Sequence, residues 1–211
     1  MVTKLQKFIY IAFLKFLWNF GSDDGNSSML TFIKSDFYRC TASVDINDLF
    51  EFVLIDPGFE FVFFLRFASL KPKSFFHKRV HAFSYYFHKK LFYKYGYQIP
   101  INTKIGKGFQ ILHFGSIIFN PIAKIGDNCT VFPGVTIGQD RKGHAPTIGN
   151  NVFIGSNSII VGGIQIGSNC LIAPGSYVNF NVPDNSLVIG NPGKFFIKNE
   201  KIISGYLNNL V

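Results

Sequence analysis

The amino-acid sequence predicts a β-solenoid preceded by an α-helical region, and three observations carry this prediction. An Ile or Val recurs at six-residue intervals between residues 99 and 178, with one long interruption. Gly or Asn stands three residues after most of these positions, and both residue types tolerate the left-handed backbone of a sharp corner. A helix would instead place apolar residues 3.6 positions apart, as the chain does between residues 74 and 91.

The six-residue repeat is regular along most of this stretch. Its starts are Ile99, Ile105, Ile111, Ile117, Ile125, Val131, Ile137, Ile148, Ile154, Ile160, Ile166, Ile172 and Val178. The expected corner residues are Gly108, Asn128, Gly134, Asn151, Asn157, Gly163, Asn169 and Gly175. Phe114 breaks this second series. One inward β-branched residue and one corner residue per repeat describe short strands stacked on one another.

The length of 211 residues suits one domain, or a solenoid with a smaller helical region. We divide the chain into a helical region (residues 1–96), a solenoid (97–195) and a tail (196–211). A loop at 139–147 interrupts the solenoid. The tail is expected to be a strand or a short helix.

The first apolar stretch of the helical region runs from Phe8 to Phe20 and is too short to span a bilayer. It predicts either an amphipathic helix at a membrane surface or a helix packed on the domain. The polar stretch from Gly21 to Ser28 predicts a loop. Short helices are expected between residues 30 and 55.

Two further helices follow. Asp56-Pro57 predicts a helix start, with Asp as the cap and Pro at the first position, and Phe59–Leu70 continues as an apolar, buried helix. Pro72 ends it, and a second helix begins at Ser74. The apolar stripe of this second helix consists of Phe76, Val80, Phe83, Phe87 and Leu91. We expect the stripe to pack on the solenoid or on a neighbouring subunit.

The net charge of +9 is concentrated beside this stripe. The stretch from Lys71 to Lys94 contains seven basic residues and no acidic one: Lys71, Lys73, Lys78, Arg79, Lys89, Lys90 and Lys94. Such a patch predicts an anionic partner, for example a phosphorylated cofactor, an acidic glycan or a phospholipid surface. We therefore expect peripheral membrane contact through this basic, aromatic region. No nucleic acid is expected, because no recognised binding motif accompanies the charge.

The three cysteines, Cys40, Cys129 and Cys170, show neither a disulfide framework nor zinc-ligand spacing. Cys129 and Cys170 occupy repeat positions where small core residues are expected. This usage fits a reducing compartment, so the expected location is the cytoplasm, with membrane association as an addition.

Two histidines lie in the repeat region and are the candidates for chemistry. His113 stands beside Phe114, where the corner pattern fails, and His144 lies in the loop at 139–147. A loop that interrupts a regular solenoid has no packing reason to exist, and loops on rigid scaffolds commonly carry function.

The dipeptide Ile-Gly occurs six times at repeat starts, which resembles the hexapeptide-repeat acyltransferases. That resemblance implies a left-handed parallel β-helix of about five coils. The segment from Lys104 to Ser116, which contains His113, resembles the serine O-acetyltransferases and their polysaccharide-directed relatives. The same resemblance extends to three further segments, which are residues 120–128, His144-Ala145-Pro146 and Gly190 to Lys194. A weaker likeness extends to residues 35–39 and 56–59.

This resemblance implies a homotrimer with active sites between subunits and acetyl-CoA as co-substrate, with no metal. It implies that His113 is the general base and that His144 is a site residue. Gln98 stands where the family has an aspartate that supports the base, and we expect it to orient His113. The implied acetyl-CoA contacts are Gly138, Gly155, Ser156, Gly175 and Lys194. The implied acceptor contacts are Asp56 and Arg141.

Three departures from the serine-specific pattern decide the expected acceptor. Gln98 and Leu112 replace aspartates, and Gly143 replaces an arginine. Because an amino acid needs charged partners in a desolvated site, the expected acceptor is a sugar hydroxyl of a capsular, exopolysaccharide or O-antigen glycan. Serine O-acetylation and a non-catalytic solenoid scaffold are the alternatives. A zinc hydratase would need three convergent histidines, and the coils contain two.

Overall fold

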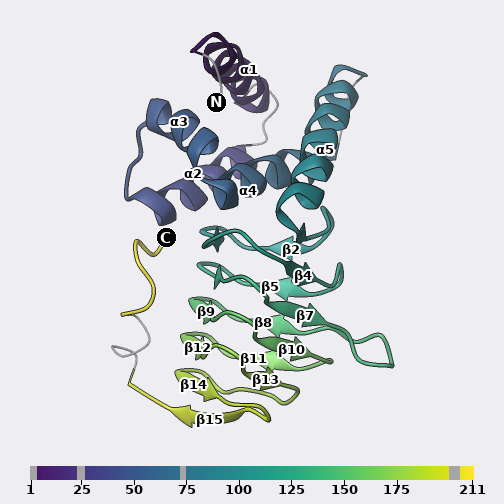
Figure 1. The fold of residues 1–211 in the computed structure, drawn as a ribbon, viewed down its shortest axis with the longest axis vertical. Helices are drawn as coiled ribbons and strands as arrows, with labels where there is room; N and C mark the ends of the chain where they lie inside the picture. Colours follow the sequence, from purple (N-terminus) through teal and green to yellow (C-terminus); the bar gives the residue numbers. More distant parts are fainter. Residues whose placement is uncertain (1–3, 23–26, 72–74, 200–204) are drawn as a thin grey trace.

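The computed structural model describes residues 4–22, 27–71, 75–199 and 205–211, with a group of helices at one end of a column of short strands (Figure 1). The helices are α1 (Lys4–Ser22), α2 (Ser27–Thr41), α3 (Ile46–Ile55), α4 (Pro57–Ala68) and α5 (Phe75–Tyr95). Gly96, in a left-handed conformation with a φ of 76°, separates α5 from the first strand.

The strands form three parallel sheets that wind in about five turns. Sheet A contains β1 (Tyr97–Gln98), β4 (Ile117–Phe119), β7 (Thr136–Gly138), β10 (Ile159–Val161) and β13 (Tyr177–Val178). Sheet B contains β2 (Lys104–Ile105), β5 (Lys124–Ile125), β8 (Thr147–Ile148) and β11 (Gln165–Ile166). Sheet C contains β3 (Gln110–Ile111), β6 (Thr130–Val131), β9 (Val152–Ile154), β12 (Cys170–Ile172), β14 (Ser186–Ile189) and β15 (Lys194–Ile197). β15 pairs antiparallel with β14 and ends the column. The predicted β-solenoid with preceding helices is confirmed.

The turns between the sheets stack into three edges of the solenoid. The His113 edge joins sheet C to sheet A and contains residues 112–116, 132–135, 155–158 and 173–176. The His144 edge joins sheet A to sheet B and contains residues 99–103, 120–123, 139–146 and 162–164. The asparagine edge joins sheet B to sheet C.

The repeat residues build the interior and the asparagine edge. The inward Ile and Val side chains are buried, and Cys129 and Cys170 are fully buried among them, as expected for core fillers. Side-chain amides of Asn128, Asn151 and Asn169 each donate to the asparagine one coil further on, at 2.9–3.1 Å. All of the predicted corner residues except Gly163 have a positive φ; Gly162 takes that conformation instead.

The first helix, α1, packs on the rest of the domain, which was one of the two predictions for this segment. Leu14, Leu17 and Trp18 are buried, and the Phe13 ring lies 4.4 Å from the Phe83 ring of α5. Within the described ranges, no helix combines the length and apolar character that crossing a bilayer requires. The predicted loop at 21–28 is wrong at both of its ends, because α1 continues to Ser22 and α2 begins at Ser27. Residues 23–26 lie outside the described residues.

The α4 start matches its prediction. Asp56 caps the helix by accepting a 2.6 Å hydrogen bond from the Phe59 backbone N–H, and Pro57 is the first helical residue. The predicted stop at Pro72 and restart at Ser74 lie outside the described residues. α5 carries the expected stripe only in part: Val80 and Leu91 are buried, whereas Phe83 is partly exposed.

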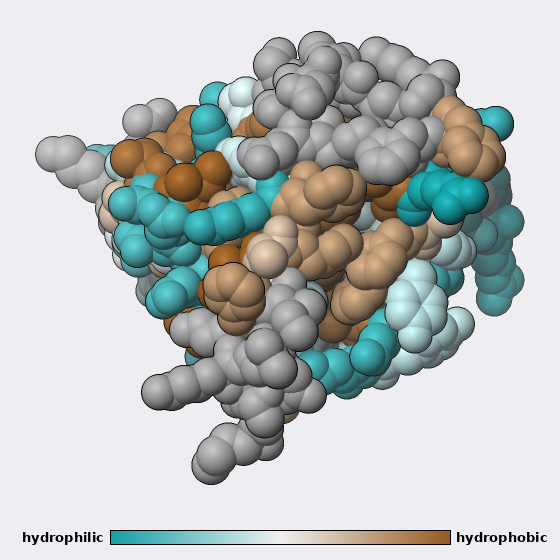
Figure 2. All heavy atoms as spheres, turned by 90° about the horizontal axis from the view of Figure 1, so that it is seen from above, coloured by the Kyte–Doolittle hydropathy of each residue, from teal (hydrophilic) through white to brown (hydrophobic). Residues whose placement is uncertain are grey.

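The helical end of the molecule exposes both apolar and basic side chains. Figure 2, which looks down on this end, shows apolar side chains gathered between hydrophilic ones. On α5, Phe75 and Tyr86 are exposed together with Lys78, Arg79 and Lys90. The peripheral membrane contact expected from this segment stays a prediction.

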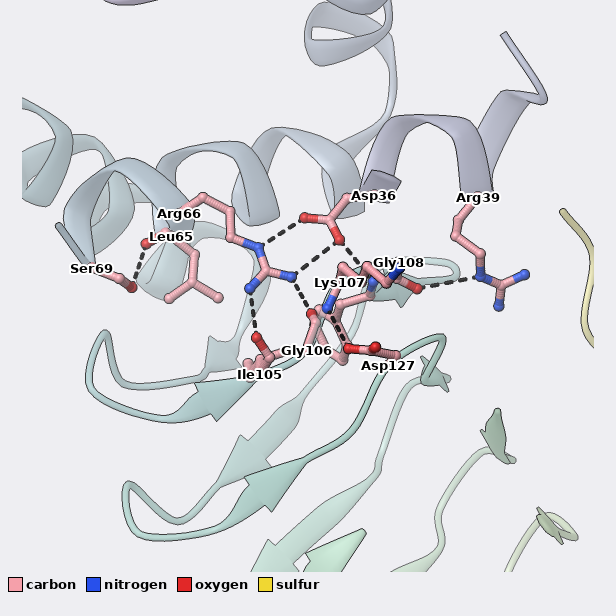
Figure 3. A network of polar contacts seen from close by, with 11 residues as sticks. Asp36, Arg39, Leu65, Arg66, Ser69, Ile105, Gly106, Lys107, Gly108 and Asp127 are labelled. Atoms are coloured by element: carbon pink, nitrogen blue, oxygen red, sulfur yellow. Dashed lines mark hydrogen bonds and ion pairs between the residues drawn. The ribbon is translucent and has the colours of Figure 1, made fainter. Parts of the chain in front are cut away.

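A buried ion pair seats the helices on the first coil (Figure 3). The Arg66 guanidinium of α4 donates to both Asp36 carboxylate oxygens, at 2.8 and 3.1 Å, and to the carbonyl oxygens of Ile105 and Gly106, at 2.8 and 2.6 Å. Asp36 also accepts from the Phe109 backbone N–H at 2.8 Å. Burial raises the pKa of Asp36, while Arg66 and Phe109 favour its charged form.

A second buried arginine extends this contact. Arg39 of α2 is 1 % exposed and donates to the Gly108 carbonyl oxygen at 3.3 Å and to the Thr130 hydroxyl at 2.7 Å. The helices are therefore joined to the solenoid by charged groups that reach backbone carbonyls of its first turn between sheets B and C.

We expect Arg66→Met to lower the free energy of unfolding by about 3–5 kcal/mol, because it leaves the Asp36 charge buried without its partner. Urea denaturation followed by circular dichroism measures this loss. Lys15→Met, at an exposed lysine of α1, is the matched control. A loss no larger than that of the control would show that the ion pair does not hold the helices in place.

Candidate active site

His113 occupies an irregular turn of the His113 edge. Other turns on this edge place Gly134, Asn157 or Gly175 in the left-handed conformation, whereas here His113 itself has a φ of 61°. The next residue, Phe114, is 72 % exposed. A residue other than Gly or Asn adopts this conformation at a cost in free energy, and it keeps it only where surrounding contacts enforce it.

Tyr97 supplies one of those contacts. Its hydroxyl donates a 3.0 Å hydrogen bond to the His113 carbonyl oxygen, and its side chain is fully buried against Phe61 and Tyr95. On the other side, the exposed His113 ring lies 5.7 Å from the Phe132 ring. Sequence reasoning missed Tyr97, because nothing in the six-residue repeat marks a residue whose hydroxyl reaches the turn that contains His113.

Asp56 faces this turn from the helical region. Gly58, two residues into the α4 segment, lies so close to β3 that an added Cβ would overlap the Ile111 carbonyl oxygen. The start of α4, with the half-buried Asp56, is therefore held against the strand that precedes His113. Burial raises the pKa of Asp56, against the hydrogen bonds from Phe59 and Gly58 and the charge of His113.

Gln98 does not join this group through a hydrogen bond. It lies exposed on β1, and no hydrogen bond links it to His113 among the described residues. The predicted orienting role for Gln98 therefore stays a prediction. Leu112, the residue before His113, is half-buried.

The loop carrying His144 is organised by Asp140, another residue that sequence reasoning missed. Its carboxylate accepts hydrogen bonds from the backbone N–H groups of Lys142 and His144, at 2.8 and 2.9 Å, and lies 3.2 Å from His144 Nδ1. These hydrogen bonds lower the pKa of Asp140. An Asp that starts a turn three residues before a Gly was the available signal.

A groove of about 630 Å³ lies beside this loop and is lined in part by Arg141, His144, Val161 and Tyr177. Gly163 is one of its lining residues, and an added Cβ there would lie 2.7 Å from the His144 Cβ. Gly163 therefore lets the loop lie flat against the coil below.

The candidate residues fall on two different edges. His113 lies between sheets C and A, whereas His144 and Arg141 lie between sheets A and B. Sheet A separates them, and its outward side chains include Ile118 and Ile159, each 39 % exposed. One chain thus holds two half-sites with a partly apolar face between them.

The candidate acetyl-CoA contacts divide in the same way. Gly155, Ser156 and Gly175 lie on the His113 edge, in coils below His113, whereas Gly138 ends β7 next to the His144 loop. An added Cβ would clash with Pro174 at Gly155 but meets open space at Gly175. Lys194 is exposed on β15, at the far end of the column.

Two other kinds of chemistry on the described residues would be a thiol nucleophile and a metal centre. Burial raises the pKa of the Cys129 thiol to about 12 and that of Cys170 to about 11, which disfavours the thiolate form that a nucleophile requires. Among the described ranges, no group of three or more His, Cys, Asp or Glu side chains could hold a metal ion.

Comparison with known proteins connects this geometry to a class of enzymes. Residues 145–179 match the family model "Bacterial transferase hexapeptide (six repeats)". A serine acetyltransferase of Bacillus pumilus is 36% identical over 117 residues, which are 54% of each chain. One of Synechococcus elongatus is 38% identical over 103 residues, 47% of this chain and 42% of that protein. The chain spans about half the length of the curated relatives it matches.

Solved structures agree with these matches. The Neisseria gonorrhoeae serine acetyltransferase in complex with serine superposes with a TM-score of 0.65 at 26% identity, covering 82% of this chain and 70% of that one. Soybean serine acetyltransferase superposes with the same score at 25% identity, covering 84% and 72%.

The expected glycan acceptor is wrong. The relatives and structural neighbours are serine acetyltransferases, so the saccharide acceptor, the role in capsule, exopolysaccharide or O-antigen synthesis and the placement among polysaccharide-directed relatives are not supported. The error came from the uncharged replacements at Gln98, Leu112 and Gly143. Those replacements leave one carboxylate in this region, because the half-buried Asp56 starts the helix that packs on the strand before His113.

We expect Tyr97→Phe to lower the free energy of unfolding by about 1–3 kcal/mol, because the His113 carbonyl oxygen loses its buried donor. The backbone chemical shifts of His113 should move away from left-handed values. Tyr93→Phe, at a tyrosine that is 76 % exposed, is the matched control for chemical denaturation and NMR. Unchanged His113 shifts in Tyr97→Phe would show that other contacts hold the turn.

Proposed function

We propose that this chain, a hexapeptide-repeat protein related to the serine acetyltransferases, transfers an acetyl group from acetyl-CoA to the hydroxyl of serine. One observation carries the proposal. An exposed histidine in a left-handed turn follows the strand on which α4 packs, the half-buried carboxylate of Asp56 caps that helix, and the solenoid matches serine acetyltransferases in sequence and fold.

In this proposal the His113 imidazole acts as the general base. A serine hydroxyl is a poor nucleophile near neutral pH, so the neutral ring takes its proton while the oxygen attacks the thioester carbonyl carbon. The new C–O bond forms and the C–S bond breaks. The imidazolium then returns the proton to the departing thiolate, and the products are O-acetylserine and CoA. No covalent acyl-enzyme is needed.

Asp56 would bind the acceptor. A carboxylate accepts several hydrogen bonds, so Asp56 can cap α4 and also receive the ammonium group of serine. Its partial burial strengthens that interaction, because the surroundings screen charge less than water does. This role makes Asp56 the residue that distinguishes an amino acid from a neutral alcohol.

We propose that a homotrimer completes the site. If sheet A of each copy faces the threefold axis, the His113 edge of one copy meets the His144 edge of the next, and Ile118 and Ile159 are covered. His144 and Arg141 would then reach the acceptor from the neighbouring copy.

The trimer also gives acetyl-CoA a path. The groove beside His144 would face Gly155, Ser156 and Gly175 of the next copy, and Gly138 borders the same groove, so the pantetheine arm can lie close to backbone amides from both. Lys194 would approach the phosphates. A cytoplasmic location, where acetyl-CoA is available, fits this proposal.

We expect His113→Ala to lower the rate of acetyl-CoA consumption with serine at least about a hundredfold, because it removes the general base. Release of the CoA thiol, measured by a thiol reagent, checks this, with Lys198→Ala on exposed surface as the control variant. Wild-type turnover in His113→Ala would exclude His113 as the general base, and a lack of turnover in the unaltered chain would favour a scaffold. Turnover with sugars but not with serine would rule out serine as acceptor.

A further inference from the structure

A second cavity lies away from both half-sites, where the helices meet the first coil. It has a volume of about 710 Å³ and lies between α2, the end of α4, the start of α5 and the segment from residue 101 to residue 105. It is thus on the His144 edge side of the first coil, whereas His113 lies on the other edge of sheet A.

The walls of this cavity are mostly apolar. Met29 and Leu65 are buried in them, and the half-buried side chains of Phe32, Leu70 and Ile101 contribute further apolar surface. The cavity is within the roughly 300–1,000 Å³ that small-molecule sites occupy, and such sites combine apolar walls with a few polar groups.

The polar groups around the cavity carry one sign of charge. Lys71 and Lys104 are exposed, His81 is half-buried, and none of the described lining residues is acidic. The Arg66 guanidinium also borders the cavity, but Asp36 and two carbonyl oxygens already satisfy it. Two lysines are therefore available to a ligand, and both favour an anion.

We propose that this cavity binds an amphipathic anion, a linear apolar chain that ends in a carboxylate or phosphate. The chain contacts Met29, Phe32 and Leu65, and the anionic head lies between Lys71 and Lys104. A free fatty acid and an anionic membrane lipid share this chemistry. The exposed Phe75 and Lys78, which precede the lining residue His81 on α5, would favour the lipid source.

Such a ligand would act on the proposed active site through α4. The N-terminal end of this helix places Asp56 beside His113, and its C-terminal turn, with Leu65 and Arg66, borders the cavity. A chain packed against that turn would also contact the Ile105 segment that Arg66 holds. Binding would therefore alter how α4 is seated and with it the affinity for the acceptor. This last step rests on the proposed function, whereas binding itself does not.

Isothermal titration calorimetry with dodecanoate below its micellar concentration tests the binding on the full chain. We expect saturable binding at one site per chain, and at least about tenfold weaker binding in Lys71→Gln/Lys104→Gln, since each lost charge-assisted contact is worth roughly a factor of ten. Lys90→Gln/Lys198→Gln removes the same charge elsewhere and should bind as the wild type does. Leu70→Trp fills the cavity and should abolish binding.

Two further ligands test the anionic head group and the source of the apolar chain. Dodecanol replaces the carboxylate of dodecanoate by a neutral hydroxyl, and equal affinity for both would overturn the role of the lysines. Vesicles of phosphatidylglycerol and of phosphatidylcholine test the lipid source: binding to the first that Leu70→Trp abolishes supports it. No binding of dodecanoate or vesicles, or binding that Leu70→Trp leaves intact, would overturn the proposal. His113→Ala should bind dodecanoate normally, so failure of the proposed chemistry would leave this result standing.

Discussion

The buried ion pair between Asp36 and Arg66 fixes the relation between the helices and the solenoid. An ion pair removed from water stabilises a structure only when its remaining hydrogen bonds are met, and here carbonyl oxygens of Ile105 and Gly106 and the Phe109 N–H meet them. Its partners belong to α2, α4 and the first coil. The pair therefore specifies one docking position, and that position sets Asp56 opposite His113.

The same docking explains why the first coil differs from the others. Below it, each turn of the His113 edge uses Gly or Asn for its left-handed residue. In the first coil, Tyr97 holds His113 in that conformation, and Gly58 lets α4 lie against Ile111. The regular coils supply a rigid base, and the irregular turn at its helical end presents an imidazole to solvent.

The repeat made the solenoid predictable because each Ile or Val must face a narrow interior and each corner must turn sharply. Cys129, Cys170 and the cap at Asp56 followed from the same local rules. Tyr97 could not be found this way, because its partner is set by a tertiary contact. Asp140 was missed although its partners lie within four residues of it in the same loop. Gly163 was assigned to a corner that Gly162 forms, since the His144 loop rests on Gly163. The acceptor was misjudged because charged residues missing from a motif were weighed without the carboxylate that the fold places beside His113.

The central claim is that two copies complete one site, with His113 from one and His144 from the next. Co-expression of His113→Ala and His144→Ala chains, each inactive alone, tests it directly. Random mixing into trimers would leave about a quarter of the interfaces with both histidines, so the mixture should recover about a quarter of wild-type activity. Activity no higher than that of the single variants would contradict a site shared between copies.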